Sequence, residues 1–447
     1  MRFRLLPACA INQQNPGTEI WPLSEKASII PEKRHGIRPD RVSANARKVV
    51  ERLQEAGFLA YIVGGSIRDL VLGHDPKDFD VATDATPEQV GEVFRNARLI
   101  GRRFRLAHVR FGREIIEVAT FRGTGEGGKD EHREVDQGRL VRDNVWGSEV
   151  EDARRRDFTI NALMYDPETS TIRDYVDGFE DLLKRRLRLI GDPVTRYRED
   201  PVRLLRAVRF KVKLELELDP PTAGPIPEMS ELLHDIPPAR LFDEILKLLM
   251  GGKAWATFQA LVGFNLWEPL FPNLFDDPGN PPALVEQALK NTDQRVAEGK
   301  PVTPAFLFAA FLWRRVEQRA EELTGEGLPP VEALAAAGEE AIAEQAERVA
   351  IHRRFSSMSK EIWCLQPRFE KRRGKRPKRL MAERRFRAAY DFLLLRALEN
   401  PELQELADWW TAFQEVDGGD RQEMARAAPG GGKRKRRRPR KRRSAAS

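Results

Sequence analysis

Residues 61–83 read YIVGGSIRDLVLGHDPKDFDVAT, and this stretch decides how the first part of the chain folds. Residues 59–63 form a short apolar run that ends at Gly64 and Gly65, which is typical of a buried strand before a tight turn. A helix is predicted after the turn with Ser66 as its cap, because a serine hydroxyl can accept a free backbone N–H of the first helical turn. The glycines would let the backbone approach a ligand, and a helix start offers N–H groups to phosphate. The pattern matches neither GxGxxG nor the Walker A motif, which excludes those two phosphate-binding motifs.

Asp78 and Asp80 open the second predicted strand. Residues two apart on a strand face the same way, so both carboxylates point to one side. Two neighbouring carboxylates repel unless a cation lies between them, and oxygen-only ligands favour Mg²⁺, which keeps substrate phosphate and water as its other ligands. Two such ions would activate the attacking oxygen and steady a leaving pyrophosphate. For the DxD motif alone, a polar turn and a site of metal-dependent glycosyl transfer stay open as alternatives.

Glu117 is the candidate for a third acid near this pair. Residues 99–120 favour strands, and Gly112-Arg113 between two apolar runs predicts a hairpin. Glu117 interrupts the second run, and a carboxylate in such a strand needs a partner or a metal. The alternative is an edge position that faces water.

Three segments carry a family resemblance: GGSIRDLVLG with DFDVAT in residues 64–83, RRRDFTINAL in 154–163, and YREDPVRLLRAVRF in 197–210. Together they resemble the bacterial poly(A) polymerase and CCA-adding enzyme family of the polymerase-β-like nucleotidyltransferases. The likeness covers most of residues 44–410. The run GRRFRLAHV at 101–109 is similar to the poly(A) polymerase branch rather than the CCA-adding branch. This resemblance implies template-independent transfer of AMP from ATP to an RNA 3′ end, with release of pyrophosphate.

The resemblance also implies a role for each matching residue. The catalytic residues would be Asp78, Asp80 and Asp157. The chemistry of the carboxylates predicts Asp78 and Asp80 as Mg²⁺ ligands of a two-metal site, with Glu117 as the candidate third ligand. The ATP-binding residues would be Gly64, Gly65, Arg68, Arg155, Arg156, Asn161, Glu199, Asp200, Arg203 and Arg206. From the residues alone, the run of arginines beside Asp157 fits either a phosphate clamp, because guanidinium matches phosphate oxygens in a fork, or a salt-bridged surface loop.

Asp200, Arg203 and Arg206 share one side of a predicted helix, with Asp200 as its cap and Pro201 at its first position. A cap and an i,i+3 ion pair would explain the spacing. A carboxylate accepts and a guanidinium donates, so the pair also complements the amino group and ring nitrogen of adenine or cytosine and opposes guanine and uracil. The family resemblance implies this base-reading role, which does not by itself separate A from C.

Two basic runs are predicted to contact RNA: Arg102, Arg103 and Arg105 in the first, and Lys371, Arg372 and Arg373 at the start of residues 371–387. A solvated strand edge and a solvated helix face are the alternatives. The net charge is +7, and residues 433–443 hold ten basic residues and no acid, so the rest of the chain carries −3. Such a tail holds polyanions in a salt-dependent way. RNA-decay proteins are its expected protein partners.

Composition indicates a globular chain of two to four domains, at 447 residues with 41% hydrophobic and 32% charged residues. The two cysteines, Cys9 and Cys364, lie far apart in the sequence, which suits a reducing cytoplasm and argues against a disulfide framework and a Cys-rich zinc site. No apolar run approaches the ~20 residues of a membrane helix, so no membrane contact is expected.

The predicted fold is α+β: an N-terminal mixed-sheet nucleotidyltransferase head, an all-α neck and body, and a disordered basic tail. The predicted parts are an irregular lead-in at 1–43, the head at 44–180, a helical neck at 181–235, an RNA-binding helical body at 236–415 and the tail at 416–447. The open functional alternatives are a CCA-adding enzyme and a non-catalytic RNA-binding scaffold, with a glycosyltransferase as a distant third.

Overall fold

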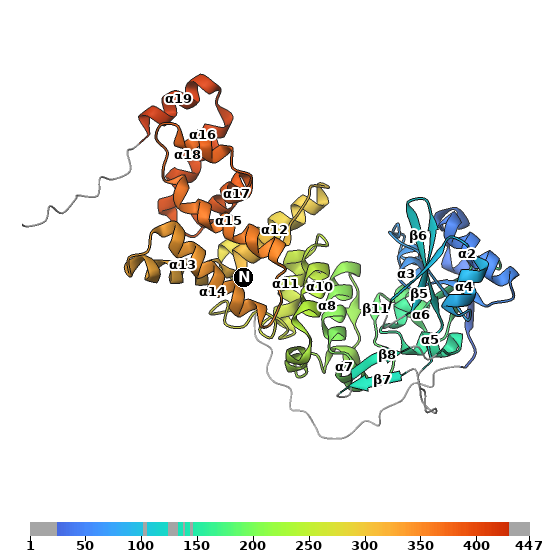
Figure 1. The fold of residues 1–447 in the computed structure, drawn as a ribbon. Coiled ribbons are helices and arrows are strands. Elements are labelled where there is room, and N and C mark those ends of the chain that lie inside the picture. The colour runs from blue at the N-terminus through green and yellow to red at the C-terminus, as the bar shows by residue number, and fades with distance from the viewer. Residues whose placement is uncertain (1–24, 102–104, 124–132, 137–138, 144–145, 429–447) are drawn as a thin grey trace, which may run out of the picture. The chain divides into compact units, whose positions relative to one another are not determined.

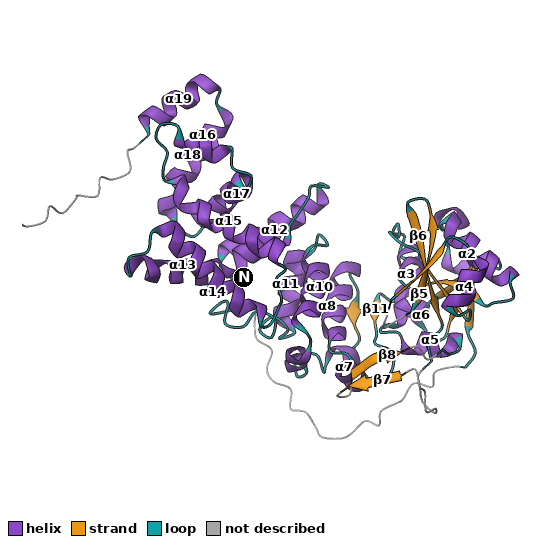
Figure 2. Ribbon diagram, viewed as in Figure 1, coloured by secondary structure: helices purple, strands orange, loops and turns teal. Residues whose placement is uncertain are grey.

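The computed structural model describes residues 25–101, 105–123, 133–136, 139–143 and 146–428. The chain divides into two compact units. The first comprises Met1–Glu199 and Glu217–Thr222, and the second comprises Asp200–Leu216 and Ala223–Ser447. Every strand of the described residues lies in the first unit, and the second is built from helices (Figures 1 and 2). The predicted α+β class is therefore confirmed.

An eight-stranded sheet forms the centre of the first unit, in the order β1-β10-β9-β2-β3-β6-β5-β4. The β3–β6 pair is parallel and the other neighbours are antiparallel, so the sheet is mixed as predicted. Its strands are β1 (Ser28–Pro31), β2 (Ala60–Val63), β3 (Asp80–Thr83), β4 (Ala97–Ile100), β5 (Leu106–Phe111), β6 (Glu114–Thr120), β9 (Met164–Asp166) and β10 (Thr171–Asp174). Two small sheets pair β7 (Arg133–Asp136) with β8 (Arg139–Asp143) and β11 (Arg186–Leu187) with β12 (Glu217–Leu218).

The helices are, in chain order, α1 (Glu32–His35), α2 (Ala44–Glu55), α3 (Gly65–Val71), α4 (Pro87–Val93), α5 (Glu149–Arg155), α6 (Gly178–Leu183), α7 (Pro193–Glu199), α8 (Val202–Leu214), α9 (Pro220–Ala223), α10 (Pro238–Leu249), α11 (Ala254–Gly263), α12 (Ala283–Ala297), α13 (Pro304–Gly325), α14 (Pro330–Ala346), α15 (Arg353–Phe369), α16 (Arg376–Met381), α17 (Phe386–Ala397), α18 (Gln404–Glu415) and α19 (Gly418–Ala427). None of the helices in the described residues is both long and apolar enough to cross a membrane.

The alternation of side chains gives the large sheet two different faces. On one face Val81, Val109 and Ile116 are fully buried, on strands that α2 and α4 contact. Side-chain caps begin both helices: the Ser43 hydroxyl accepts the Ala46 N–H, and Thr86 forms a capping box with Gln89. The apolar face therefore anchors the sheet and leaves the other face to carry polar residues.

The opposite face is apolar only in part. Tyr61 and Ala82 pack there with Ala153 of α5 and Met164 of β9 in one buried cluster. Farther along the face, β3, β6 and β5 carry exposed or half-exposed polar side chains. This boundary between packed and open sheet is where the candidate site lies.

β12 belongs to the first unit although it follows α8 in the chain. It pairs in parallel with β11, and fully buried Thr222 just beyond it holds two further contacts. The Thr222 hydroxyl accepts the Leu189 N–H at 3.0 Å, and its carbonyl accepts the Tyr197 hydroxyl at 2.9 Å. The chain thus leaves the first unit for 17 residues, Asp200–Leu216, which belong to the second unit. It then returns with Glu217–Thr222, which complete the first unit.

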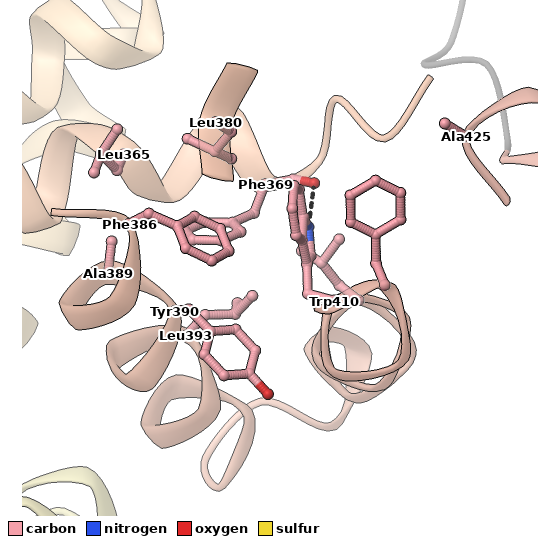
Figure 3. Packing of buried hydrophobic residues seen from close by; sticks show 11 residues of the cluster. Leu365, Phe369, Leu380, Phe386, Ala389, Tyr390, Leu393, Trp410 and Ala425 are labelled. Atoms are coloured by element: carbon pink, nitrogen blue, oxygen red, sulfur yellow. Dashed lines mark hydrogen bonds between the residues drawn. The ribbon is translucent and has the colours of Figure 1, made fainter. Parts of the chain in front are cut away.

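Aromatic side chains form a core cluster in the C-terminal helices of the second unit. Phe369, Phe386 and Tyr390 pack with Trp410 from α15, α17 and α18 (Figure 3). The Trp410 indole N–H donates to the Phe369 carbonyl at 2.9 Å, so its polar atom is satisfied inside the cluster. Ala425 of α19 joins the same cluster.

The two ends of the chain differ from their predictions. The lead-in at 1–43 is predicted to be mostly irregular, but residues 28–31 form β1, because pairing with β10 buries Ile30 to 1% exposure. The tail at 416–447 is predicted to be disordered, but residues 418–427 form α19, which buries Ala425. Residues 1–24 and the basic run at 433–443 lie outside the described residues.

Candidate active site

The register of β3 and β6 places two acids side by side. Asp80 is the Cα partner of Glu117 in this parallel pair, and directly paired residues share a face. The prediction that both aspartates lie on the strand is wrong for Asp78. β3 begins only at Asp80, because its pairing with β2 ends at that residue. Asp78 precedes the strand, with Phe79 buried between the two. The pKa of Asp80 is raised to about 6, first by burial and then by the negative charges of Glu117 and Asp78, while Arg156 acts in the opposite direction. The carboxylates of Glu117 and Asp78 are thus close enough to Asp80 to interact with it electrostatically.

The three carboxylates fit a magnesium ion that takes its remaining ligands from the substrate and from water. Among the described residues, no group of three or more histidines, cysteines or acids is arranged to hold a metal by itself. Mg²⁺ is usually bound through one or two carboxylates and takes its other ligands from phosphates and water. Asp78, Asp80 and Glu117 offer only oxygen donors, and the mutual repulsion around Asp80 would be relieved by a cation.

His108 is a neighbour of this site that the sequence analysis missed. It faces Glu117 across the β5–β6 hairpin, with 3.6 Å between Nε2 and a carboxylate oxygen of Glu117. The signal was available, because the predicted two-residue turn at Gly112-Arg113 pairs residue 111 with 114 and so 108 with 117.

The glycine turn lies next to the acids, because Val63 pairs with Asp80. Gly64 has φ of +79° and ψ of −137°, a conformation that side chains other than glycine rarely adopt. A Cβ there would lie 3.4 Å from Nη1 of Arg156. The prediction that Ser66 caps the helix is wrong: α3 already begins at Gly65, so Ser66 lies inside it and donates to the Val63 carbonyl at 3.2 Å.

Arg68, Asn161 and Asp157 are brought together in an internal network. Arg68 is 4% exposed, and its Nε and Nη2 donate to Asp69 at 2.8 and 2.6 Å. Its Nη1 donates to the Asn161 side chain at 2.6 Å, and Asn161 in turn donates to Asp157 at 3.1 Å. The network ties α3 to the RRD segment, so the Arg68 guanidinium is engaged by protein partners.

The backbones of Arg155 and Arg156 are held by one arginine, and the Arg156 side chain is held by a carboxylate. Arg196 of α7 donates to the carbonyls of Arg155 and Arg156 at 2.7 and 2.5 Å and also pairs with Glu199 at 2.9 Å. The Arg156 guanidinium bonds Asp152 at 2.8 and 3.2 Å. Arg196 and Asp152 are both absent from the predicted site, although Glu199 is in it.

The predicted base-reading residues lie in the second unit. α8 begins at Val202, one residue later than predicted, with Pro201 as its N-cap, and Asp200 accepts the Val202 N–H at 3.3 Å. The other Asp200 oxygen accepts Nη2 of Arg240 at 2.7 Å, a partner from α10 that sequence spacing did not indicate.

Half-buried arginines follow Asp200 along α8. Arg203 and Arg206 stand three residues apart, and Arg209 continues the same row, while leucine, alanine and valine positions between them are buried. Arg209 lies 3.5 Å from the buried Glu244. The predicted face of donors is therefore present and is longer than the sequence analysis proposed.

The predicted RNA-contacting residues differ in accessibility. Lys371 and Arg373 are exposed, but the Arg372 side chain is only 13% exposed, pairs with Glu405 at 2.9 Å and lies over the Trp409 ring. Arg105 is about half exposed and pairs with Glu88 at 2.7 Å. Arg102 and Arg103 lie outside the described residues.

Comparisons with known proteins show similarity over most of the chain. Three family models match successive parts: "Poly A polymerase head domain" at residues 60–188, "Probable RNA and SrmB- binding site of polymerase A" at 215–277, and "Polymerase A arginine-rich C-terminus" at 326–444. Poly(A) polymerase I of Salmonella typhi is 51% identical over 398 residues, 87% of this chain and 86% of that protein.

CCA-adding enzymes are similar over less sequence but share the fold. The enzyme of Lactobacillus helveticus is 38% identical over 230 residues, 52% of this chain and 55% of that protein. The crystal structure of the Bacillus stearothermophilus CCA-adding enzyme in complex with CTP matches with a TM-score of 0.54 at 24% identity, covering 85% of this chain and 86% of that one.

Proposed function

This chain belongs to the bacterial poly(A) polymerase and CCA-adding enzyme family, and we propose that it adds AMP from ATP to RNA 3′ ends without a template, releasing pyrophosphate. The observation that carries the proposal is the 51% identity to a poly(A) polymerase I over 87% of the chain, spanning both units. The likeness to a CCA-adding enzyme covers only 52% of the chain. The expected role of the product is to mark RNA for processing or decay.

The acids on the sheet face would hold the catalytic magnesium. Asp78 and Asp80 are the proposed ligands of two Mg²⁺ ions, with Glu117 as a third. When bound, Mg²⁺ would supply charge neutralisation for the attacking and leaving oxygens. The rest of the rate would come from positioning, as is general for phosphoryl transfer.

The residues around the glycine turn would hold the nucleotide. Gly64 and Gly65 offer an approachable backbone, and Arg156 lies 3.4 Å from where a Cβ of Gly64 would be. Arg155 with Arg156 and Asp157 would serve phosphate and ribose. Arg68 would have to exchange its bonds to Asp69 and Asn161 for phosphate oxygens, so we propose that it rearranges when ATP binds, with Asn161 as its partner in the free protein.

The adenine would be read by Asp200, Arg203 and Arg206, next to Glu199 in the sequence. Asp200 already accepts from Arg240, which orients its carboxylate before any base arrives. RNA would be held by exposed cations, among them Lys371, Arg373 and Arg105, and by the basic run at 433–443. Binding of RNA-decay proteins by that run is part of the same proposal.

One assay tests the proposal against its two rivals. The protein is incubated with Mg²⁺, ATP and CTP and with either a tRNA that lacks its 3′ CCA or an unstructured RNA. A ladder of A residues on the unstructured RNA is the expected result, because the product of each step remains a substrate. Addition that stops after CCA on the tRNA would show a CCA-adding enzyme, and RNA binding without incorporation would show a scaffold.

A further inference from the structure

We propose that Asp152 is a positioning residue for nucleotide binding, which fixes the Arg156 guanidinium beside the Gly64 turn where the triphosphate would lie. The inference rests on the proposed function, because it assigns Arg156 to ATP. Asp152 lies in the first turn of α5, and Arg156 is the residue directly after that helix. Asp152 touches none of the reacting groups and acts only through Arg156.

The carboxylate of Asp152 is itself held firmly. The residue is 8% exposed, and one of its oxygens accepts the backbone N–H of Arg122 at 3.3 Å, just beyond β6. The other accepts Nη2 and Nε of Arg156 at 2.8 and 3.2 Å. A carboxylate in a first helical turn is also favoured by the free N–H groups there. Asp152 is thus fixed by the main chain before it fixes the arginine.

The guanidinium has a defined place as a result. Its Nη1 donates to the Asn161 carbonyl at 3.3 Å and lies 3.4 Å from where a Cβ of Gly64 would stand. Its positive charge reaches Asp80, whose pKa it lowers against the effect of burial. Arg156 therefore lies beside the glycine turn and acts electrostatically on Asp80, so a triphosphate held by the turn and the acids would come within its reach.

The arginine keeps capacity for a ligand in this arrangement. Among the described residues, its contacts to Asp152 and Asn161 use three of the five N–H groups of a guanidinium. The remaining two are available to phosphate oxygens, which guanidinium bonds in a fork. Without Asp152, the side chain would lose the contact that aims it, while its charge would stay.

α5 supplies a matched control for the carboxylate. Glu149 lies one turn earlier on the same helix, and its side chain is 15% exposed against 11% for Asp152. It accepts from Nη2 of Arg173 at 2.9 Å and from the Tyr175 hydroxyl, neither of which is part of the candidate site. Neutralising Glu149 therefore tests the helix without touching Arg156.

The test compares Asp152→Asn with Glu149→Gln in the full-length protein. We expect Asp152→Asn to raise KM for ATP about tenfold, the scale of one hydrogen bond to a charged group, with kcat lowered much less. Glu149→Gln should leave both constants within about twofold when rates are divided by the folded fraction. Equal rises in KM for both variants would show that Asp152 only supports the helix, and so would overturn the proposal.

Two further variants keep the test sharp if Asp152→Asn folds poorly. Arg156→Lys retains the charge but cannot bond Asp152 and a phosphate together, so it should raise KM for ATP to a similar degree. The double variant Asp152→Asn/Arg156→Gln should have a KM for ATP less than about twofold above that of Arg156→Gln alone. If the KM increase of the double variant equals the product of the two single-variant increases, Asp152 acts independently of Arg156, which contradicts the proposal.

ATP binding measured by calorimetry separates this inference from the proposed function. If the wild-type protein binds ATP but adds no AMP to RNA, the proposed function fails while the effect of Asp152→Asn on ATP affinity remains measurable. If the protein polyadenylates RNA and Asp152→Asn binds ATP as the wild type does, only the inference fails.

Discussion

Two aspartates of the first unit have opposite surroundings. Asp181 of α6 is fully buried, and one of its oxygens accepts Nε of Arg186 at 2.6 Å. The other accepts the Thr159 hydroxyl at 2.6 Å and Nε of Arg188 at 2.9 Å. Asp80 stands on the open part of the sheet face, and its pKa is raised first by burial and then by the carboxylates of Glu117 and Asp78.

The contrast shows how one residue type serves stability in one place and binding in another. Surrounded by donors, a buried carboxylate ties segments together, and Asp181 joins the RRDFTIN segment to β11 in this way. A carboxylate placed among like charges is destabilised when ionised, and a bound cation relieves this repulsion at neutral pH, which is a mark of functional sites. The comparison predicts that a substitution at Asp80 mainly reduces activity, whereas a substitution at Asp181 mainly reduces stability.

The largest expected effect is on activity at Asp80. Asp80→Asn should lower the rate of AMP incorporation by about 10³-fold or more, because a bound metal ion supplies several kcal/mol of transition-state stabilisation. Asp78→Asn should behave in the same way. The measurement is the initial rate of ATP incorporation into an unstructured RNA, with RNA affinity as a control that should stay close to wild type. Normal elongation by both variants would contradict the assignment.

A smaller effect, on folding, is expected at Asp181. Asp181→Ala leaves Arg186 and Arg188 without their buried acceptor and should reduce the free energy of unfolding by about 3–5 kcal/mol. Denaturant unfolding followed by fluorescence measures the loss. Activity per folded molecule should fall far less than in Asp80→Asn, and a thousandfold fall with unchanged stability would reverse the two roles.

The smallest effect is a pH-dependent stability difference at Asp80. Its pKa in the folded chain, about 6, exceeds the 3.8 of an ordinary aspartate, so the folded state binds the proton more tightly. This contribution is fully present below about pH 4 and is lost as pH rises through 6. Without metal, Asp80→Asn should therefore melt up to a few degrees higher than wild type at pH 7.5, with the difference vanishing near pH 4. The difference in melting temperature stays small because water at the partly exposed carboxylate screens its charge.

Calorimetry in EDTA and then in Mg²⁺ tests this difference. Magnesium should raise the melting temperature of the wild type more than that of Asp80→Asn, because only the wild type keeps the full ligand set. Identical melting of both proteins at pH 7.5 in EDTA would mean that Asp80 is not destabilised by its neighbours.

Local pattern predicted the parts of the site that local forces determine. The strand and glycine turn before α3 and the Gly112-Arg113 hairpin follow from side-chain spacing and turn chemistry. The hairpin register alone would have brought His108 to Glu117, and this signal was overlooked.

Long-range contacts were beyond the reach of the same reasoning. Arg196 bonds carbonyls some forty residues earlier, and Arg240 bonds Asp200 across forty residues of helical chain. Each depends on tertiary packing that leaves no periodic trace in the sequence. β1 was missed for a related reason, since a four-residue edge strand gains its stability from β10 rather than from its own pattern.

The late return of β12 limits how this protein can be divided or recombined. A gene fragment that stops after residue 199 would lack β12 and Thr222, and would leave β11, Leu189 and Tyr197 without their partners. Chimeras between relatives with different nucleotide preference should therefore exchange residues 1–222 as one block. We expect hybrids joined after residue 199 to fold poorly, because β12 and Thr222 would come from a different parent than their partners. A lack of activity in such hybrids would then report misfolding and not nucleotide specificity.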